Sequence, residues 1–375
     1  MRLRPRGRVA VGGALGAAVR RGRRTIEDTR RAPPTAQAFW WRGPFEGEIR
    51  PEPLPAPRSD EVLVETLYSG VSRGTEALIA AGSVPASEHG RMRCPFQAGD
   101  FPFPVKYGYS AVGRIVEGPP ERRGRIAFVL HPHQTRFTVP LDAVTLLPPD
   151  VPPGRAVLAA NLETALNALW DARLLPGDRV VVVGAGVVGS LIARLAARVP
   201  GTEVVLVDRN PARAALAATL GAAFRATTDS ARDGADAAVA GHAEGADLVV
   251  EASGDPRALE TCLAAAAFEA TVLVVGWYGA ARAMLPLGEA FHSRRLRLVA
   301  SQVSHVAPAQ RSRWPPRRRL AKVIELLRDP VLDRLITGES PFEALPDVLP
   351  RLLRDPGNEL CHRIVYPGAR GRGVS

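Results

Sequence analysis

The sequence is poor in several residues that would otherwise decide its class. It has only two lysines, Lys106 and Lys322, and its three cysteines, Cys94, Cys262 and Cys361, lie far apart. Widely spaced cysteines in odd number form neither a disulfide framework nor a Cys-x-x-Cys metal site, which favours a reducing, cytoplasmic compartment. No apolar run of about 18 residues or more occurs, so the sequence excludes a transmembrane helix and we expect no membrane partner.

Acidic residues are scarce in two stretches that account for the net charge. The 375-residue chain has a formal charge of +11, of which residues 1–31 carry +8 and Arg311–Arg319 carries +5, which leaves −2 elsewhere. The body of the protein is therefore not a basic binding domain. We interpret residues 1–35 as a disordered or misannotated basic leader, with a targeting or RNA-contacting arm as the alternative. We expect nucleic acid to meet only this arginine-rich tail, and without specificity.

The rest of the composition is typical of a globular chain, with 46% hydrophobic and 23% charged residues. The length suggests two domains. Residues 36–160 read as short strands between glycines and prolines, which predicts a β-rich domain. In residues 161–305 short apolar runs alternate with helices, as in a doubly wound parallel sheet covered on both faces. Residues 306–375 resemble the first domain again and are expected to return to it, with a helix at Leu320–Leu327 and a strand near Cys361–Tyr366.

A glycine-rich fingerprint follows the first expected strand of the second domain. Gly184, Gly186 and Gly189 form a Gly-x-Gly-x-x-Gly pattern around Val187 and Val188. The first glycine permits a tight turn, the second the approach of a pyrophosphate, and the third close packing of the next helix on the strand. That helix presents free N–H groups to phosphates at its start. The expected buried strands are Val180–Val183, Val204–Val207, Leu248–Glu251, Thr271–Val275 and Leu296–Ser301.

The second of these strands ends in an acidic residue. Asp208 stands nineteen residues after Gly189, where a carboxylate can accept hydrogen bonds from both ribose hydroxyls of a dinucleotide and repel a 2′-phosphate. Arg209 beside it can stack on adenine or pair with a 2′-phosphate. We therefore predict NAD as the cofactor, with NADP as the alternative.

By its motifs the chain resembles the medium-chain dehydrogenase/reductase superfamily, of the zinc alcohol dehydrogenase type, over residues 36–366. The matching segments are Ser69–Glu76, Tyr107–Gly113, Thr164–Leu166, Gly177–Val180 and Leu335–Thr337. The resemblance implies an α/β protein in which both chain ends build a GroES-like β-rich catalytic domain around a central Rossmann domain, assembled as a dimer or tetramer. More narrowly, the chain is similar to the branch of the bacteriochlorophyllide dehydrogenases, which carry a similar Gly-Thr-Glu motif.

The sequence departs from this family at its zinc ligands. Arg73 replaces the expected cysteine, Tyr109 replaces the expected histidine, and Ala160 lies near the later thiol position. A catalytic zinc uses about three protein ligands, and the four-cysteine structural lobe has no counterpart, so we predict neither zinc. We interpret His131 and His133 as hydrogen-bonded histidines on one face of a strand. A substrate-facing His133 and a metal site are the alternatives.

Without zinc, other groups must stabilise the oxygen anion that accompanies hydride transfer. Arg73 could act as a permanent cationic clamp, and Tyr109 could donate a proton if a nearby cation lowered its pKa. Thr75 matches the hydroxyl that relays protons in zinc-dependent relatives. Glu76 would orient Arg73, and the alternatives for this pair are a structural ion pair and a phosphate contact. Glu163 could face the substrate as an acid–base group or a hydrogen-bond anchor.

Further residues are expected beside the nicotinamide. The resemblance implies that Thr164, Gly276 and Trp277 flank it, while Ser253 follows the fourth strand at the edge where ligands bind in open α/β sheets. The alternative for Trp277 is plain hydrophobic cover. Lys106 is one more candidate cation.

Together these features predict a zinc-independent, NAD(P)-dependent oxidoreductase that interconverts a secondary alcohol and a carbonyl on a small-molecule substrate. One alternative is a reductase of an activated C=C bond, which zinc-free relatives in the superfamily perform. The other is a cofactor-binding protein without catalytic activity.

Overall fold

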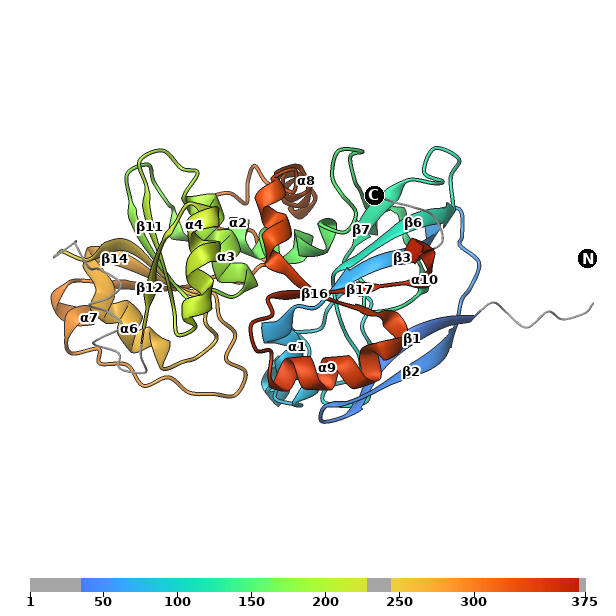
Figure 1. The fold of residues 1–375 in the computed structure, drawn as a ribbon, viewed down its shortest axis with the longest axis horizontal. Coiled ribbons are helices and arrows are strands. Elements are labelled where there is room, and N and C mark those ends of the chain that lie inside the picture. The colour runs from blue at the N-terminus through green and yellow to red at the C-terminus, as the bar shows by residue number, and fades with distance from the viewer. Residues whose placement is uncertain (1–34, 228–243, 371–375) are drawn as a thin grey trace, which may run out of the picture. The chain divides into compact units, whose positions relative to one another are not determined.

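The computed structural model describes residues 35–227 and 244–370 (Figure 1). Apart from Thr35, the predicted basic leader lies outside the described residues. The described part of the chain contains three β-sheets of six, seven and four strands.

The six-stranded sheet has the order β12-β11-β10-β13-β14-β15, and every neighbouring pair in it is parallel. Its strands are β10 (Arg179–Val183), β11 (Glu203–Asp208), β12 (Ala223–Ala226), β13 (Ala246–Glu251), β14 (Ala266–Val274) and β15 (Arg297–Ala300). The five expected strands are present, although β14 begins five residues earlier than its apolar run indicates. The short strand β12 at the sheet edge was not expected.

Apolar side chains cover both faces of this sheet, as its continuous valine runs predict. On β10, Val180 and Val182 belong to a hydrophobic cluster with residues of four helices, whereas Val181 and Val183 belong to a cluster on the opposite face with residues of a fifth. The first four helices are α2 (Ala159–Ala172), α3 (Val187–Ala196), α4 (Ala214–Leu220) and α8 (Pro316–Leu326), and the fifth is α6 (Ala258–Ala265). This arrangement confirms the predicted doubly wound parallel sheet.

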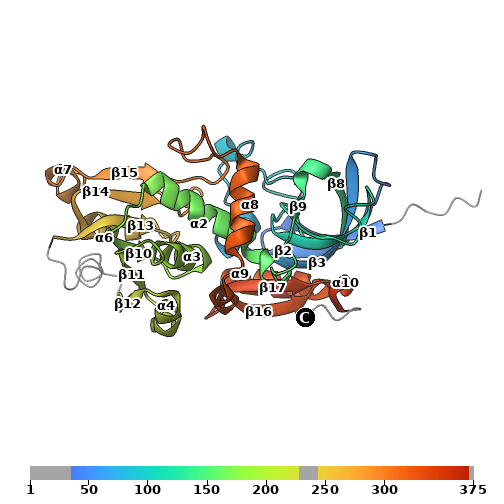
Figure 2. The same ribbon diagram turned by 90° about the horizontal axis from the view of Figure 1, so that it is seen from above.

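The other two sheets are built from both ends of the described chain. The seven-stranded sheet has the order β16-β17-β3-β6-β7-β9, with β8 also paired to β3, and the four-stranded sheet has the order β2-β1-β5-β4. Strand β17 pairs antiparallel with β3, and Figures 1 and 2 show these red and blue strands side by side. The strands are β1 (Thr35–Gly43), β2 (Glu46–Pro53), β3 (Glu61–Gly70), β4 (Ala98–Gly99), β5 (Val105–Lys106), β6 (Ala111–Glu117), β7 (Ile126–Val129), β8 (Arg136–Pro140), β9 (Thr145–Leu146), β16 (Ile336–Pro341) and β17 (Cys361–Val365).

The remaining helices complete the framework around these sheets. They are α1 (Arg73–Ala80), α7 (Ala290–Ser293), α9 (Leu345–Arg354) and α10 (Pro367–Arg370), and single turns of 3₁₀ helix lie at Ala86–Glu88, Leu141–Ala143, Ala156–Leu158, Pro211–Arg213, Pro330–Leu335 and Phe342–Ala344. No helix of the described residues has both the length and the apolar character needed to cross a membrane.

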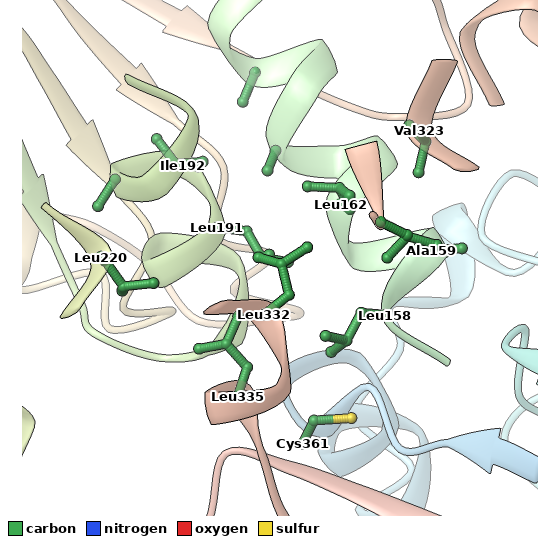
Figure 3. Close-up of a cluster of buried hydrophobic side chains, with 14 of the residues drawn as sticks. Leu158, Ala159, Leu162, Leu191, Ile192, Leu220, Val323, Leu332, Leu335 and Cys361 are labelled. Carbon is green, nitrogen blue, oxygen red and sulfur yellow. The ribbon is translucent and has the colours of Figure 1, made fainter. Parts of the chain in front are cut away.

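One hydrophobic cluster joins the parallel sheet to the β-rich part (Figure 3). Leu162 of α2 and Leu191 of α3 belong to it, and so do Leu335 and Cys361 from the C-terminal return. Because the same cluster includes residues of both parts, α2 and the C-terminal segment are fixed against each other.

The arginine-rich segment Arg311–Arg319 is not a loop throughout. Helix α8 begins at Pro316, a position where proline is well suited because its missing N–H has no partner in the first turn. Arg319 is only 3% exposed, so its charge lies inside the protein and does not add to a surface patch. The helix expected at Leu320–Leu327 thus begins four residues earlier and includes three of the five arginines.

Candidate active site

A cavity of about 810 Å³ lies between the glycine-rich turn of the parallel sheet and the start of α1. It brings together thirteen of the predicted site residues, which are, in chain order, Arg73, Thr75, Tyr109, Thr164, Gly184, Gly186, Val187, Val188, Asp208, Arg209, Ser253, Gly276 and Trp277. Glu76, Glu163 and Gly189 do not line it.

The three glycines of the turn meet three different steric demands. A Cβ at Gly184, where φ is +105°, would lie 2.6 Å from the Ser253 Cα, and one at Gly189 would lie 1.9 Å from the Gly184 carbonyl oxygen. At Gly186 an added Cβ would meet no atom within 4 Å, so the backbone there is open to the cavity. The turn and the N-terminus of α3 thus fit a dinucleotide pyrophosphate.

Asp208 is held at the end of β11 beside this turn. Its Oδ2 accepts a hydrogen bond from the Ala185 N–H at 2.7 Å, and its Oδ1 accepts one from the Asn210 N–H at 2.8 Å. Each carboxylate oxygen keeps a second lone pair with which it can accept a ribose hydroxyl. The residue therefore presents to the cavity a fixed carboxylate that can still accept hydrogen bonds.

A buried carboxylate organises the loops at the carboxyl ends of β13 and β14. Glu251 Oε1 accepts hydrogen bonds from the Ser253 N–H, the Ser253 hydroxyl and the Gly254 N–H, at 2.7, 2.5 and 3.1 Å. Its Oε2 accepts one from the Tyr278 hydroxyl at 2.6 Å. Burial and this carboxylate raise the pKa of Tyr278. Sequence reasoning treated Glu251 only as the end of a strand and missed this role.

On the opposite wall the side chains of Tyr109 and Asn161 both contact the Ser72 hydroxyl. The Tyr109 hydroxyl donates to Ser72 Oγ at 2.5 Å, and Asn161 Nδ2 donates to the same oxygen at 3.2 Å. Burial raises the pKa of Tyr109 to about 12, with Ser72 and Thr75 opposing the shift. The hypothesis of a lowered pKa for Tyr109 is therefore wrong, because its surroundings desolvate the phenol and bring no cation to it.

Glu76 lies behind this wall at 1% exposure. Its Oε1 accepts a hydrogen bond from the Ser72 N–H at 2.7 Å, and its Oε2 lies 3.1 Å from His133 Nε2. His133 Nδ1 lies 2.8 Å from Ser69 Oγ, which lies 2.9 Å from the Tyr366 hydroxyl. These buried groups form a series of hydrogen bonds that runs from Tyr366 through Ser69, His133 and Glu76 to the Ser72 N–H.

Arg73 turns away from Glu76, so the expected pair between them is not formed. Its Nη1 donates to the Glu359 carbonyl at 2.5 Å. Burial and Arg213 lower the pKa of Arg73, while Asp208 and Glu359 act in the opposite direction. These neighbours place the guanidinium beside Asp208 at the cavity, and the substrate clamp and the phosphate contact both remain predictions for Arg73.

Two other candidate charges are already neutralised inside the protein. Glu163 is 6% exposed, and its Oε1 accepts a hydrogen bond from Arg319 Nε at 3.0 Å, so it does not face the cavity. Lys106 Nζ donates to Glu52 Oε2 at 2.6 Å and to Gln134 Oε1 at 2.8 Å. Neither residue is available to a substrate in this arrangement.

The two histidines of the His-Pro-His segment lie outside any strand, contrary to expectation. The His131 ring stacks on Phe137 with ring centroids 3.7 Å apart, and its Nδ1–H donates to the Pro132 carbonyl at 2.9 Å. His133 is 1% exposed and bonded on both ring nitrogens, as described above. Both side chains are hydrogen-bonded within the fold.

The residues at the family's zinc positions do not fit zinc. Arg73 and Ala160 offer no ligand, and Tyr109 is engaged with Ser72. Among residues 35–227 and 244–370, no group of three or more His, Cys, Asp or Glu side chains is arranged to hold a metal ion. Ser72, Tyr109 and Asn161 line the cavity beside these positions with hydroxyl and amide groups.

Comparison with known proteins matches residues 187–322 to the family described as "Zinc-binding dehydrogenase". A D-guloside 3-dehydrogenase of Escherichia coli (strain K12) is 28% identical over 178 residues, which cover 48% of this chain and 51% of that protein. The chain thus spans about half the length of this relative. A 2-desacetyl-2-hydroxyethyl bacteriochlorophyllide A dehydrogenase of Cereibacter sphaeroides is 25% identical over 278 residues, covering 69% of this chain and 79% of the relative.

A solved dehydrogenase structure from Sinorhizobium meliloti 1021, bound to NADP, has a TM-score of 0.71 and 20% sequence identity, covering 88% of this chain and 99% of its own. This likeness confirms the predicted fold, a GroES-like β-rich part combined with a Rossmann-type sheet.

Ser72, Asn161 and Glu251 are the site residues that sequence reasoning missed. Ser72 lies inside the Ser69–Glu76 motif, so its position was visible, but a serine in a loop carries no distinctive signal. Asn161 did carry a signal, because it is the polar residue within the apolar run Val157–Leu162. A polar side chain in such a run is expected to be buried and hydrogen-bonded.

Proposed function

The chain belongs to the medium-chain dehydrogenase/reductase superfamily, and from this we propose that it is a zinc-independent, nicotinamide-dependent oxidoreductase. The proposed reaction interconverts a secondary alcohol and a carbonyl by hydride transfer. The observation that carries the proposal is the single cavity that has the glycine-rich turn and Asp208 on one wall and the Ser72, Tyr109 and Asn161 cluster on the other.

The cofactor that these residues fit is NAD. The open backbone at Gly186 accommodates the pyrophosphate, and the two free lone pairs of Asp208 suit ribose hydroxyls. Arg209 and Arg73 also line the cavity and keep NADP as the alternative. A nicotinamide cofactor supplies or accepts the hydride.

The protein's own residues orient the substrate and stabilise its oxygen. In the reducing direction the hydride bonds to the carbonyl carbon, the C=O π pair moves onto oxygen, and a proton from water completes the alcohol. The cluster at Ser72 offers hydrogen bonds to that oxygen, which can replace a Lewis acid in stabilising its negative charge. Thr164, Gly276 and Trp277 bound the same part of the cavity.

Arg73 contributes at the cofactor. Arg73 is the first residue of α1, and its guanidinium lies near Asp208 and Arg213. A charge that persists at all relevant pH values suits contact with an anionic phosphate. We assign Arg73 to the cofactor phosphates in place of the substrate.

We further propose a cytoplasmic location and the domain limits 36–160, 161–305 and 306–375. The three cysteines are free and buried, as in proteins of reducing compartments.

The full-length protein tests this function in two steps. The first measures zinc content and the affinities for NADH and NADPH from fluorescence titrations. The second screens turnover with NAD and NADP on secondary alcohols, polyols, glycosides and tetrapyrrole or pterin alcohols, and includes an α,β-unsaturated ketone with NADH. We expect NADH binding, less than about a tenth of an equivalent of zinc, and oxidation of at least one alcohol.

Other results would redirect the proposal. About one zinc per chain would overturn zinc independence, and turnover of the unsaturated ketone alone would favour C=C reduction. NADH binding without any turnover would favour a non-catalytic binding protein, and absence of binding would remove the function altogether.

A further inference from the structure

We propose that the Ser72 hydroxyl donates the hydrogen bond that polarises the substrate's carbonyl oxygen. The inference rests on the proposed function and assigns the substrate-facing donor within that site. Ser72 lines the cavity, while its backbone and side chain are held by three other residues, Glu76, Tyr109 and Asn161.

A count of donors and acceptors supports this assignment. A serine hydroxyl has two lone pairs and one hydrogen. Tyr109 O–H fills one lone pair of Ser72 Oγ, and Asn161 Nδ2–H fills the other. Within residues 35–227 and 244–370 no acceptor receives the Ser72 hydrogen. Because the residue borders the cavity, that hydrogen is available to an oxygen atom bound there.

The Tyr109 hydroxyl has no hydrogen left to donate to a bound oxygen, because it gives its only hydrogen to Ser72. A hydroxyl that accepts a hydrogen bond becomes a stronger donor itself, so Tyr109 makes Ser72 a stronger donor than an isolated serine.

The backbone of Ser72 is fixed from behind. Glu76 Oε1 accepts the Ser72 N–H at 2.7 Å, and Glu76 itself is held by His133, Ser69 and Tyr366. None of these four residues reaches the cavity, so they are positioning residues. A donor that is already oriented needs no reorganisation when negative charge develops on the substrate oxygen, which is the condition for effective catalysis by hydrogen bonding.

The first test is Ser72→Ala in the full-length protein, measured with the alcohol that the substrate screen identifies. Loss of one pre-oriented donor to an oxygen anion lowers kcat by about 10²- to 10³-fold. We expect that loss with an unchanged affinity for NADH. Ser72→Thr, which keeps a hydroxyl, should recover most of the turnover.

The matched control is Ser110→Ala. Ser110 is 1% exposed, donates to the Val157 carbonyl and does not line the cavity. Its loss should lower the melting temperature without affecting kcat. Equal turnover of Ser72→Ala and the wild type, or an equal loss in both alanine variants, would overturn the assignment.

A second readout does not depend on turnover. Isobutyramide presents a carbonyl that NADH does not reduce, and its binding to the protein–NADH complex can be followed by NADH fluorescence. One neutral hydrogen bond is worth about 1 kcal/mol, or roughly fivefold in affinity, so Ser72→Ala should weaken binding by about that factor and Ser110→Ala should not. Failure of the wild type to bind NADH refutes the proposed function, whereas NADH binding with equal or undetectable amide binding in wild type and Ser72→Ala refutes the role of Ser72.

Discussion

Asp208 combines two tasks that a single substitution can separate. It accepts backbone N–H groups that shape the glycine-rich turn, and it presents negative charge to the cavity. Arg73, Arg209 and Arg213 surround it. Among these charged neighbours, the Asp208 carboxylate is the group that opposes binding of a 2′-phosphate.

We therefore expect Asp208→Asn to shift cofactor preference towards NADP. The amide keeps one acceptor for the turn but removes the repulsion, so the ratio of the NADP and NAD dissociation constants should fall by about tenfold or more, equivalent to about 1.4 kcal/mol. Fluorescence titration with NADH and NADPH measures it, with exposed Asp142→Asn as control. An unchanged ratio would show that Asp208 does not contact the ribose.

His131 makes stability depend on pH. Burial lowers its pKa from the ordinary value to about 3. Below about pH 6.5 the unfolded chain binds a proton on this residue and the folded protein does not, so acidification favours unfolding by up to about 1.4 kcal/mol per pH unit.

In His131→Phe the part of the pH dependence of stability that comes from His131 should disappear. Phenylalanine preserves the stacking on Phe137, so the melting temperature should fall less between pH 6.5 and 4 than in the wild type, although the bond to Pro132 is lost. Thermal unfolding across that range tests it, with exposed His292→Gln as control. Parallel pH profiles of wild type and His131→Phe would contradict the assignment.

Site residues could be predicted from the sequence where spacing along the chain alone positions them. The prediction failed where the direction of the side chain decides whether a residue reaches the cavity. Gly184, Gly186 and Asp208 follow from the fixed geometry of a strand, a turn and a helix. Glu163 was chosen because it neighbours Thr164, yet adjacent residues of a helix point about 100° apart. Thr164 therefore lines the cavity while Glu163 faces α8.

At the scale of elements, α2 and α8 are joined by a buried polar network. Arg319 of α8 donates to Glu163 and Asn167 of α2 and to the Val303 carbonyl. Burial raises the pKa of Glu163, and Arg319 opposes that shift. The network fixes the helix that carries Asn161 and Thr164 to the cavity.

Arg319→Met should destabilise the fold by about 3–5 kcal/mol, the usual cost of removing one partner of a buried ion pair. The loss should be greater at pH 8 than at pH 5. With its pKa raised further, Glu163 stays protonated in the folded protein while the unfolded chain releases that proton above about pH 4.5. Urea unfolding at both pH values measures this, with exposed Arg317→Met as control. An equal loss at both pH values would exclude Glu163 as the cause.

Elements buried on both faces were the most predictable. The valine runs of β10 and β11 are typical of a parallel sheet covered on both faces. Strand β12, Ala223–Ala226, is short and mostly exposed, and its sequence shows no such pattern. The start of α8 was missed because its first turn, Pro316–Arg319, is dominated by proline and arginine. Arg319 in this turn is buried because α2 packs beside it, which the local sequence does not reveal.

At the scale of the molecule, β15 forms one edge of the parallel sheet. In the described part of the chain no strand pairs with its outer side, and Leu298 on it is 40% exposed. An exposed apolar edge strand readily pairs with another copy. This supports the expectation of a homodimer, with two β15 strands at the interface.

Leu298→Lys should then convert the dimer to a monomer, because charge on an edge strand opposes pairing. Light scattering coupled to size exclusion measures the mass, and exposed Leu175→Lys serves as control. A dimer that persists in Leu298→Lys would place the interface elsewhere.

The pairing of β17 with β3 also sets an order on biosynthesis. Ser69 and Tyr366 are in hydrogen-bond contact although 297 positions separate them in the sequence, so the β-rich sheet stays incomplete until β17 has left the ribosome. The parallel sheet between them uses neighbouring segments and can form earlier. During translation, β3, the strand that leads to Ser72, therefore lacks this neighbour until long after it has been synthesised.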